Sequence, residues 1–356
     1  MREIEHQRLP ELLTGHISLV DTSEGWQPLR LPANEAHLYD PFNRLTAGMT
    51  SGVRLRLVTD ATHLKLTMAQ RQSYLTHPGQ WPTLYDLFID GKLDRRTSAV
   101  GGQVGLSGEV VGEPAAVLDL EDLPAGEKRL ELWLPPTALV SITALEIESG
   151  ASWSPWPDQR LRIVFHGSSI TQGVDADASS EAWPAVAARL AGAQMLNLGW
   201  AGSCLISGLA GRIVRDQPAD LIVLELGVNV HGEGLLKERT FLSSVHAMLS
   251  IIREVHAAKP IVVISPIYCA AAEMTAQGDG LTLVQMRDLL EQVVTVRKAA
   301  GDDNLVYMSG LDLLGAADGG DLADGLHPNS AGYAKMGQRF DAQAKSLGFL
   351  PRQSIG

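Results

Sequence analysis

The pattern of apolar and polar residues differs between the two halves of the chain. Up to about residue 150 they alternate, as in Val53–Val58 and Leu130–Leu134. Alternation with period 2 is typical of strands that bury one face. The apolar run Leu87–Ile89 leads into Asp90-Gly91, which indicates a two-residue hairpin turn because glycine adopts positive φ without strain. Many short strands with no helical pattern between them predict an all-β, jelly-roll-like sandwich domain over residues 1–150.

Residues 151–158 show no periodicity, and we interpret them as a linker. A different pattern begins after them. Unalternated apolar runs of the kind buried on both faces of a sheet then follow at Leu161–Phe165, Met195–Leu198, Leu221–Leu226, Ile261–Ile264 and Leu305–Met308. Helical patterns are expected between and after them, from a cap at Ser180 to Leu190, and over Phe241–His256, Leu283–Lys298 and Ala331–Leu347. Alternation of strand and helix predicts an α/β domain over 159–356, with a parallel sheet and helices on both faces.

Composition narrows the class of protein. A chain of 356 residues with 45% hydrophobic content can bury the cores of two domains. Its net charge of −12 argues against nucleic acid or an anionic membrane as a partner, because either would need a basic surface. The first residues show no secretory signal, no apolar run reaches the length of a membrane span, and two cysteines suit free thiols. We therefore expect a cytoplasmic protein.

Candidate chemistry lies at the ends of the predicted parallel strands. Ser169 follows the first apolar run, Gly202 the second and Asn229 the third, while Asp324 and His327 lie in a loop beyond the fifth. In an open parallel sheet, ligands bind beyond the carboxyl ends of the strands, so convergence of these residues is expected from topology. A serine hydroxyl needs a base to act as a nucleophile, and the base needs a third group to orient it.

In these blocks the C-terminal part of the chain resembles the SGNH, or GDSL, hydrolase family. Gly-Ser-Ser-Ile-Thr at 167–171, Gly202, Asn229 and Asp-x-x-His at 324–327 match its four blocks in order. The resemblance implies a three-layer α/β/α fold with a flavodoxin-like parallel sheet. Two positions depart from the family pattern, because Ser168 replaces the usual aspartate and Val230 the aspartate that often follows the asparagine. With a β domain in front, the chain resembles a bacterial subgroup that includes an acyltransferase.

The resemblance also implies roles for the residues. Ser169 would attack an ester carbonyl, His327 would take its proton, and Asp324 would orient the imidazole. Donors to the oxyanion would be the backbone N–H groups of Ser169 and Gly202 and the side-chain amide of Asn229. The expected function is a serine esterase that cleaves an O-acyl ester of a small molecule or carbohydrate. No cofactor and no metal are expected, because the sequence contains no Cys-x-x-Cys, no His-x-x-x-His on a helix and no Gly-x-Gly-x-x-Gly after a strand.

Other interpretations remain open at this point. An O-acyltransferase would use the same triad, and a carbohydrate-binding protein without activity would use the fold alone. Gly199 competes with Gly202 by position, and Cys204 is interpreted as a small buried residue rather than a nucleophile. His166 and His231 would have structural roles or line the pocket. A homo-oligomer is possible.

Overall fold

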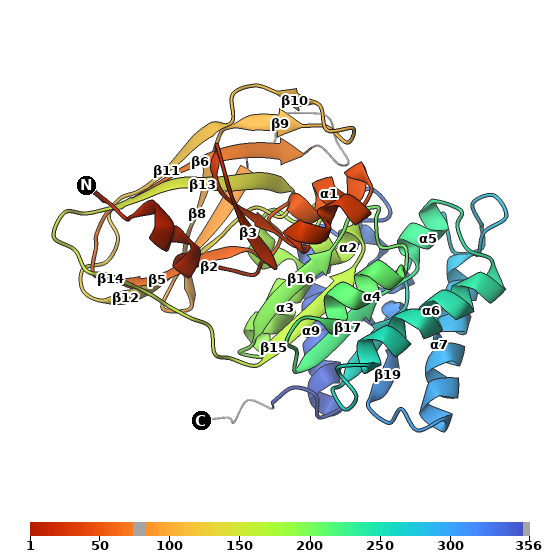
Figure 1. Cartoon of the computed structure of the whole chain (residues 1–356). Coiled ribbons are helices and arrows are strands. Elements are labelled where there is room, and N and C mark those ends of the chain that lie inside the picture. The colour runs from red at the N-terminus through yellow and green to blue at the C-terminus, as the bar shows by residue number, and fades with distance from the viewer. Residues whose placement is uncertain (74–82, 352–356) are drawn as a thin grey trace. The chain divides into compact units, whose positions relative to one another are not determined.

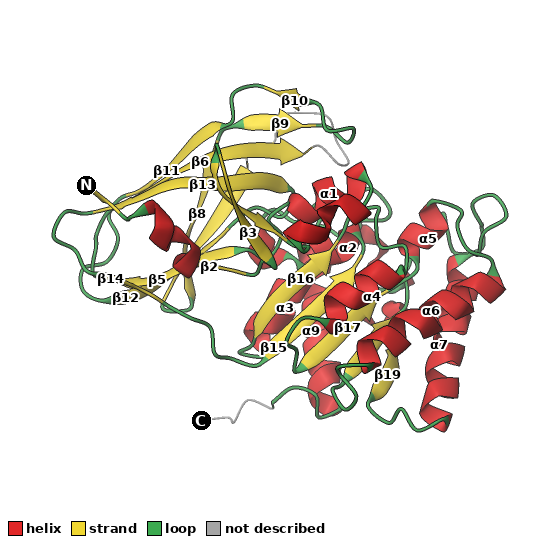
Figure 2. Ribbon diagram, in the orientation of Figure 1, coloured by secondary structure: helices red, strands yellow, loops and turns green. Residues whose placement is uncertain are grey.

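The computed structural model describes residues 1–73 and 83–351, in two compact units (Figure 1, Figure 2). The first unit contains Met1–Gln159 together with Asp177–Ser180. The second contains Arg160–Ala176 and Glu181–Gly356. The chain therefore leaves the second unit for four residues, which belong to the first unit, and then returns.

Two mainly antiparallel sheets build the first unit. The larger, in the order β10-β9-β6-β13-β4-β3 with β1 on β13 and β11 on β6, contains β1 (Arg2–Glu3), β3 (Ser18–Thr22), β4 (Gly25–Leu29), β6 (Leu64–Ser73), β9 (Gly102–Val104), β10 (Val110–Val111), β11 (Ala115–Leu120) and β13 (Ala138–Ile147). The smaller, in the order β14-β5-β12-β7-β8 with β2 on β5, contains β2 (Leu13–Thr14), β5 (Arg54–Thr59), β7 (Thr83–Ile89), β8 (Lys92–Ala99), β12 (Lys128–Trp133) and β14 (Trp153–Pro155). Apolar side chains from both sheets, such as Leu57 and Ile142, form one core.

The local strand signals correspond to strands of this unit. Each alternating segment contains or overlaps a strand, and Asp90 and Gly91 connect β7 to β8 with φ values of 50° and 81°. Positive φ at both central residues is the backbone of a type I′ hairpin turn. β14 lies within the expected linker and pairs with β5. The jelly-roll topology stays a prediction.

The first unit also contains helices that the alternation did not indicate. They are α1 (Pro41–Gly48) and the 3₁₀ helices η1 (His6–Leu12) and η2 (Ala33–Leu38). At the start of α1, the Asp40 carboxylate accepts the N–H of Asn43 at 2.9 Å, and Pro41 occupies the first turn. Both features favour a helix start. Eight residues are too few for a clear helical period, so only this capping signal was available.

A five-stranded parallel sheet forms the centre of the described part of the second unit. Its order is β16-β15-β17-β18-β19, with bounds β15 (Arg162–Gly167), β16 (Gln194–Gly199), β17 (Leu221–Glu225), β18 (Ile261–Ile264) and β19 (Leu305–Met308). Numbered along the chain this is the 2-1-3-4-5 order of flavodoxin-like sheets. Each predicted apolar run overlaps one of these strands, and the strand residues are buried except at the start of β15 and in the middle of β19.

Helices cover both faces of this sheet (Figure 2). On one face α3 (Trp183–Leu190) packs against α9 (Ser330–Ser346), and on the other lie α4 (Gly208–Arg215), α6 (Glu238–Arg253) and α7 (Leu283–Ala299). The short helices of this unit are α2 (Ser169–Gln172), α5 (Val228–Gly232), α8 (Gly310–Leu313) and η4 (Ala316–Asp321), whereas η3 (Ser179–Glu181) begins in the first unit. The three-layer α/β/α fold predicted from the sequence is confirmed.

Ser180 does not cap the helix that follows it. The N-cap of α3 is Ala182, and the Ser180 hydroxyl donates instead to the fully buried carboxylate of Asp86. Nearby, the Gly52 N–H donates to the Ser179 hydroxyl at 3.4 Å. These bonds within the first unit place the segment 177–180 there. The cap expected at Ser180 is therefore wrong, because its hydroxyl has a partner 94 residues away.

Two further observations concern the chain as a whole. Across residues 1–73 and 83–351, no helix is both long enough and apolar enough to cross a membrane. Cys204 and Cys269 are buried and free.

Candidate active site

The carboxyl edge of the parallel sheet gathers the residues singled out in the sequence. Ser169 begins α2 directly after β15, Gly202 follows β16, and Asn229 lies in α5 directly after β17. Asp324 and His327 lie in the loop that leads into α9. All five belong to the second unit, so its fold alone brings them to this edge.

Three of these side chains form one hydrogen-bonded row. Ser169 Oγ lies 2.8 Å from His327 Nε2, and His327 Nδ1 lies 2.7 Å from Asp324 Oδ2. Ser169 is buried, and the side chains of His327 and Asp324 are 11% and 28% exposed. A hydroxyl, an imidazole and a carboxylate in this order can generate a nucleophile at neutral pH.

A tight loop fixes the carboxylate against the imidazole. Asp324 Oδ1 accepts the backbone N–H groups of Leu326 at 2.9 Å and His327 at 2.7 Å. The Ala323 N–H closes the loop on the His327 carbonyl at 2.7 Å, and Gly325 between them has φ 87°. Burial by itself would raise the pKa of Asp324, but the hydrogen bonds from His327 and Leu326 lower it below its ordinary value. The carboxylate is therefore ionised at neutral pH.

A buried carboxylate, Glu225 at the end of β17, holds the residue before Ser169. Glu225 Oε2 accepts the Ser168 N–H at 2.8 Å, the Ser168 hydroxyl at 2.7 Å and the Thr171 hydroxyl at 3.2 Å. A side chain at Gly167 would place Cβ 2.7 Å from the same oxygen, which explains the glycine. Burial raises the pKa of Glu225, and the hydrogen bonds from Ser168 and Thr171 oppose that rise. Sequence reasoning missed Glu225, whose only signal was a charged residue inside an apolar strand.

The same contacts leave the Ser169 N–H unpaired. Ser168 N–H donates to Glu225, and Ile170 N–H donates to the Ser168 hydroxyl at 3.1 Å, so the donors on both sides have acceptors. Within residues 1–73 and 83–351, Ser169 N–H has none. An N–H group at the start of a helix, next to the hydroxyl, is suitably placed for an anionic oxygen.

The N–H of Gly202 also lacks an acceptor although its neighbours have one, whereas the N–H of Gly199 is paired. Ala201 N–H donates to Gln172 Oε1 at 2.9 Å and Ser203 N–H to the Trp200 carbonyl at 3.0 Å, but the described residues offer Gly202 N–H no acceptor. Gly202 has φ 65°, which favours glycine.

Gly199 has a packing role instead. Its N–H donates to Asn197 Oδ1 at 2.8 Å, so this donor is already used. A Cβ at Gly199 would lie 2.7 Å from the Gln172 Cα, inside van der Waals contact with the helix of the nucleophile. Close approach of two backbones therefore explains this glycine, and the geometry favours Gly202 as the donor.

The orientation of the Asn229 amide follows from a neighbour. The Cys204 backbone N–H donates to Asn229 Oδ1 at 3.1 Å, so the oxygen end of the amide is occupied. In the described part of the chain, Nδ2 at the other end has no acceptor. An N–H donor of a side chain is thus available beside those of Ser169 and Gly202.

Cys204 and His166 form a neutral pair behind this edge. Cys204 Sγ lies 3.6 Å from His166 Nε2, and the His166 Nδ1–H donates to the Leu198 carbonyl at 2.9 Å. Burial, followed by the charge of Glu225, raises the pKa of the Cys204 thiol well above its ordinary value, and burial lowers the pKa of His166 to about 4. A protonated thiol beside a neutral imidazole gives no thiolate nucleophile.

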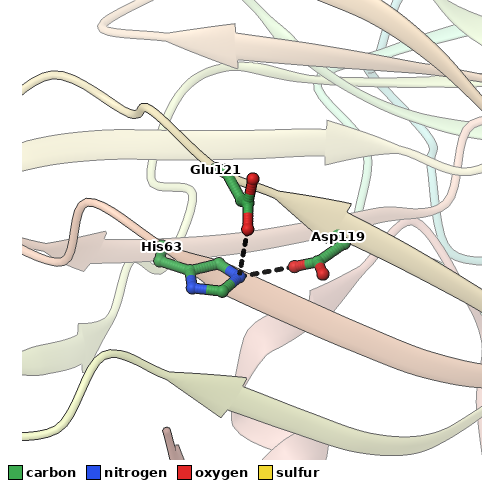
Figure 3. A group of neighbouring side chains, drawn as sticks. All are labelled: His63, Asp119 and Glu121. Carbon is green, nitrogen blue, oxygen red and sulfur yellow. Dashed lines mark hydrogen bonds and ion pairs between the residues drawn. The ribbon is translucent and has the colours of Figure 1, made fainter.

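A separate group of titratable side chains lies in the first unit. His63 Nε2 is 2.5 Å from Asp119 Oδ1 and 4.0 Å from Glu121 Oε1 (Figure 3). The three side chains are 30%, 51% and 68% exposed. Exposed groups that pair with one another are common on protein surfaces, and their interaction is weak.

Two protein-family models match the chain. Residues 160–345 match the model of the GDSL-like lipase/acylhydrolase family, and residues 12–141 match that of the SsfX3 N-terminal domain. Among curated proteins, the comparison finds no match to this chain.

Three solved structures illustrate the likeness. The salicylyl acyltransferase SsfX3 from a tetracycline biosynthetic pathway is 30% identical, with a TM-score of 0.85 over 96% of each chain. A putative GDSL-like lipase from Bacteroides ovatus is 21% identical, with a TM-score of 0.77 over 99% of each chain. A family two carbohydrate esterase from Clostridium thermocellum is 19% identical, with a TM-score of 0.64 over 85% of this chain and 94% of the other. The resemblance stated from the sequence is confirmed, and the chain belongs to the GDSL-like lipase/acylhydrolase family.

Proposed function

We propose that this protein is a serine esterase that cleaves an O-acyl ester of a small molecule or carbohydrate through an acyl-enzyme on Ser169. The observation that carries the proposal is the hydrogen-bonded row from Ser169 Oγ through the ring of His327 to Asp324, with distances of 2.8 Å and 2.7 Å. Family membership supports an enzyme that acts on esters.

Acylation begins with the attack of Ser169 Oγ on the ester carbonyl carbon. His327 Nε2 takes the hydroxyl proton as the new C–O bond forms, and the carbonyl π electrons move to oxygen. The proton on Nδ1 stays on the ring and is held by the Asp324 carboxylate, which stabilises the imidazolium. When the tetrahedral intermediate collapses, His327 gives its proton to the departing alcohol. The acyl group is then attached to Ser169.

The oxyanion of this intermediate has three N–H donors to receive it. They are the backbone N–H groups of Ser169 and Gly202 and the Nδ2 of Asn229, none of which has an acceptor among the described residues. Donors that need no rearrangement stabilise the transition state more than the substrate. One such donor contributes about 2.7–4 kcal/mol to the lowering of the barrier.

Deacylation decides between hydrolysis and transfer. In hydrolysis, water attacks the acyl-enzyme with His327 as base, and Ser169 leaves with the proton returned to its oxygen. A second candidate is an O-acyltransferase, in which an acceptor hydroxyl takes the place of that water. The likeness to the salicylyl acyltransferase, at 30% identity over 96% of the chain, favours this candidate.

Carbohydrate binding by the first unit has less support. Trp133 is 1% exposed, and the Trp26 ring stacks on His6 at 5.6 Å while its Nε1 donates to the His6 carbonyl. The Trp133 ring is thus buried, and His6 occupies one face of the Trp26 ring, which leaves less aromatic surface on which a sugar could stack. Trp81 lies outside the described residues.

The decisive experiment measures the intact mass after treatment with a fluorophosphonate, together with p-nitrophenyl acetate turnover. The wild-type protein takes one adduct and turns over the ester, and Ser169→Ala does neither. Ser243→Ala is the control, because it removes an exposed hydroxyl of α6 and still takes one adduct. An adduct on Ser169→Ala, or an unlabelled wild type, contradicts the proposal.

Addition of acceptor alcohols then separates the two candidates. With an esterase, the released acyl group appears as free acid at all alcohol concentrations. With a transferase, the product shifts from acid to the new ester as the alcohol is added, whereas the labelling of Ser169 is the same in both cases.

A further inference from the structure

A second carboxylate faces the ring nitrogen that Asp324 holds. Asp175 Oδ2 lies 3.9 Å from His327 Nδ1, compared with 2.7 Å for Asp324 Oδ2. One oxygen of each carboxylate and one ring nitrogen of His327 lie within 4.8 Å of one another. At 3.9 Å the Asp175 oxygen is too far for a hydrogen bond, so it acts on the ring through its charge.

The position of Asp175 is fixed from two sides. The N–H groups of Gly173 and Val174 both donate to the Ser169 carbonyl, at 2.9 Å and 3.0 Å. The fully buried Tyr333 of α9 donates its hydroxyl to the Val174 carbonyl at 2.6 Å. The residue directly before Asp175 is thus tied to the nucleophile itself and to the helix that follows His327. The distance between Asp175 and the ring is therefore set by the folded chain.

The backbone conformation of Asp175 is energetically unfavourable. Its φ of 66° lies in the left-handed region, which any residue other than glycine enters at an energetic cost. Its side chain is 17% exposed, and a carboxylate oxygen of Asp324 lies nearby. The left-handed backbone at Asp175 thus lies beside His327, where it directs a carboxylate toward the ring.

We propose that Asp175 is a positioning residue that stabilises the protonated ring of His327 during the attack of Ser169. Asp324 accepts the Nδ1 hydrogen bond and orients the ring, and Asp175 adds a second negative charge on the same side. No proton moves to Asp175. The proton from Ser169 stays on Nε2 until the alcohol leaves. This inference rests on the proposed function, because it concerns the base of that reaction.

The test compares Asp175→Asn, Asp324→Asn and the double variant. Each is measured for kcat and KM on p-nitrophenyl acetate, for the rate of fluorophosphonate labelling and for Tm. Asp175→Asn lowers kcat and the labelling rate by roughly tenfold with KM unchanged, because only the charged transition state loses stabilisation. In the Asp324→Asn background the same change lowers both rates further, because it removes the remaining carboxylate.

Two other variants show whether a lower rate comes from the lost charge of Asp175 or from lower stability of the fold. Asp175→Gly removes the carboxylate and relieves the backbone strain, so it keeps or raises Tm and loses the same rate. Asp177→Asn removes a carboxylate two residues away whose side chain is 63% exposed and pairs with Arg96, and it keeps the wild-type kcat. A rate loss that appears only together with a loss of Tm overturns the inference.

The outcomes also separate this inference from the proposed function. A wild-type protein that labels on Ser169, together with Asp175→Asn and Asp175→Gly variants that react within twofold of it, overturns only the role of Asp175. A wild-type protein that does not label overturns both.

Discussion

Ser168 donates both its backbone N–H and its hydroxyl to one oxygen of Glu225, at 2.8 Å and 2.7 Å. The family pattern has an aspartate at position 168, and this chain has the carboxylate on the neighbouring strand instead. The bonds hold the residue directly before Ser169 without using the Ser169 N–H. Glu225 thus fixes the backbone next to the nucleophile through Ser168 and leaves the Ser169 N–H available.

Glu225→Gln tests the protonation of this buried carboxyl group. Because burial raises the pKa of Glu225 in the folded state, its contribution to stability is full below its unfolded pKa of 4.5 and is lost as pH rises through the folded pKa. Glutamine does not titrate. The Tm of Glu225→Gln minus that of wild type therefore increases between pH 4 and pH 8. Thermal melts check this, with the exposed Glu238→Gln as control, and a flat difference contradicts it.

For Asp324→Asn, the Tm difference from wild type changes with pH in the opposite direction. The folded structure lowers the pKa of Asp324, so its contribution to stability is present above its unfolded pKa of 3.8 and is lost as pH falls through the folded pKa. The Tm of the variant minus that of wild type is thus more negative at pH 6 than at pH 3. The same variant loses about 100-fold or more in kcat at neutral pH. Equal Tm differences at the two pH values would show that the hydrogen bonds to Asp324 do not form.

Asn229→Asp separates the two ends of the amide. Aspartate keeps an oxygen for the Cys204 N–H and loses the Nδ2 donor, whereas Asn229→Ala loses both. Both variants should lower kcat by about 100–1,000-fold with little change in KM, because the donor acts on the transition state. Steady-state kinetics on p-nitrophenyl acetate give the values. Wild-type kcat in Asn229→Asp would remove Asn229 from the oxyanion donors.

His166 should remain neutral through the ordinary range of pH. Burial lowers its pKa to about 4, and the Leu198 carbonyl requires the proton on Nδ1. Its ring nitrogens should keep one set of ¹⁵N chemical shifts between pH 5.5 and pH 8, as measured by NMR. As pH falls from 6.5 to 4, His166 is protonated in the unfolded chain but stays neutral in the folded protein. This difference lowers the free energy of unfolding by about 3 kcal/mol. A ring that titrates near pH 6.5 would place His166 in contact with solvent.

The parallel-sheet domain was predictable because its signals are local. Each buried strand is a short apolar run, and each candidate site residue except the Asp324–His327 pair lies within a few residues of the end of such a run. The topology of a parallel sheet then brings these ends to one edge. The Asp324–His327 pair was recognisable because three residues of spacing allow one loop to hold both groups.

Residues whose partners are distant in sequence were missed. Glu225 reads as part of the run Leu221–Leu226, and its partner Ser168 is 57 residues away. Ser180 reads as a helix cap, but its hydroxyl is used by Asp86. Asp175 shows neither a motif nor a period, because its position depends on Tyr333, far along the chain. Local propensity cannot reveal a role that depends on such pairings.

The four residues 177–180 give the chain a particular order of assembly. The buried Asp86 in the first unit is satisfied in part by the Ser180 hydroxyl, and Gly52 pairs with Ser179. During synthesis, the N-terminal unit therefore cannot complete its own hydrogen bonding when residue 159 leaves the ribosome. It must wait until β15 and the nucleophile have emerged as well. The maturation of the first unit is thus tied in time to the part of the chain that carries Ser169.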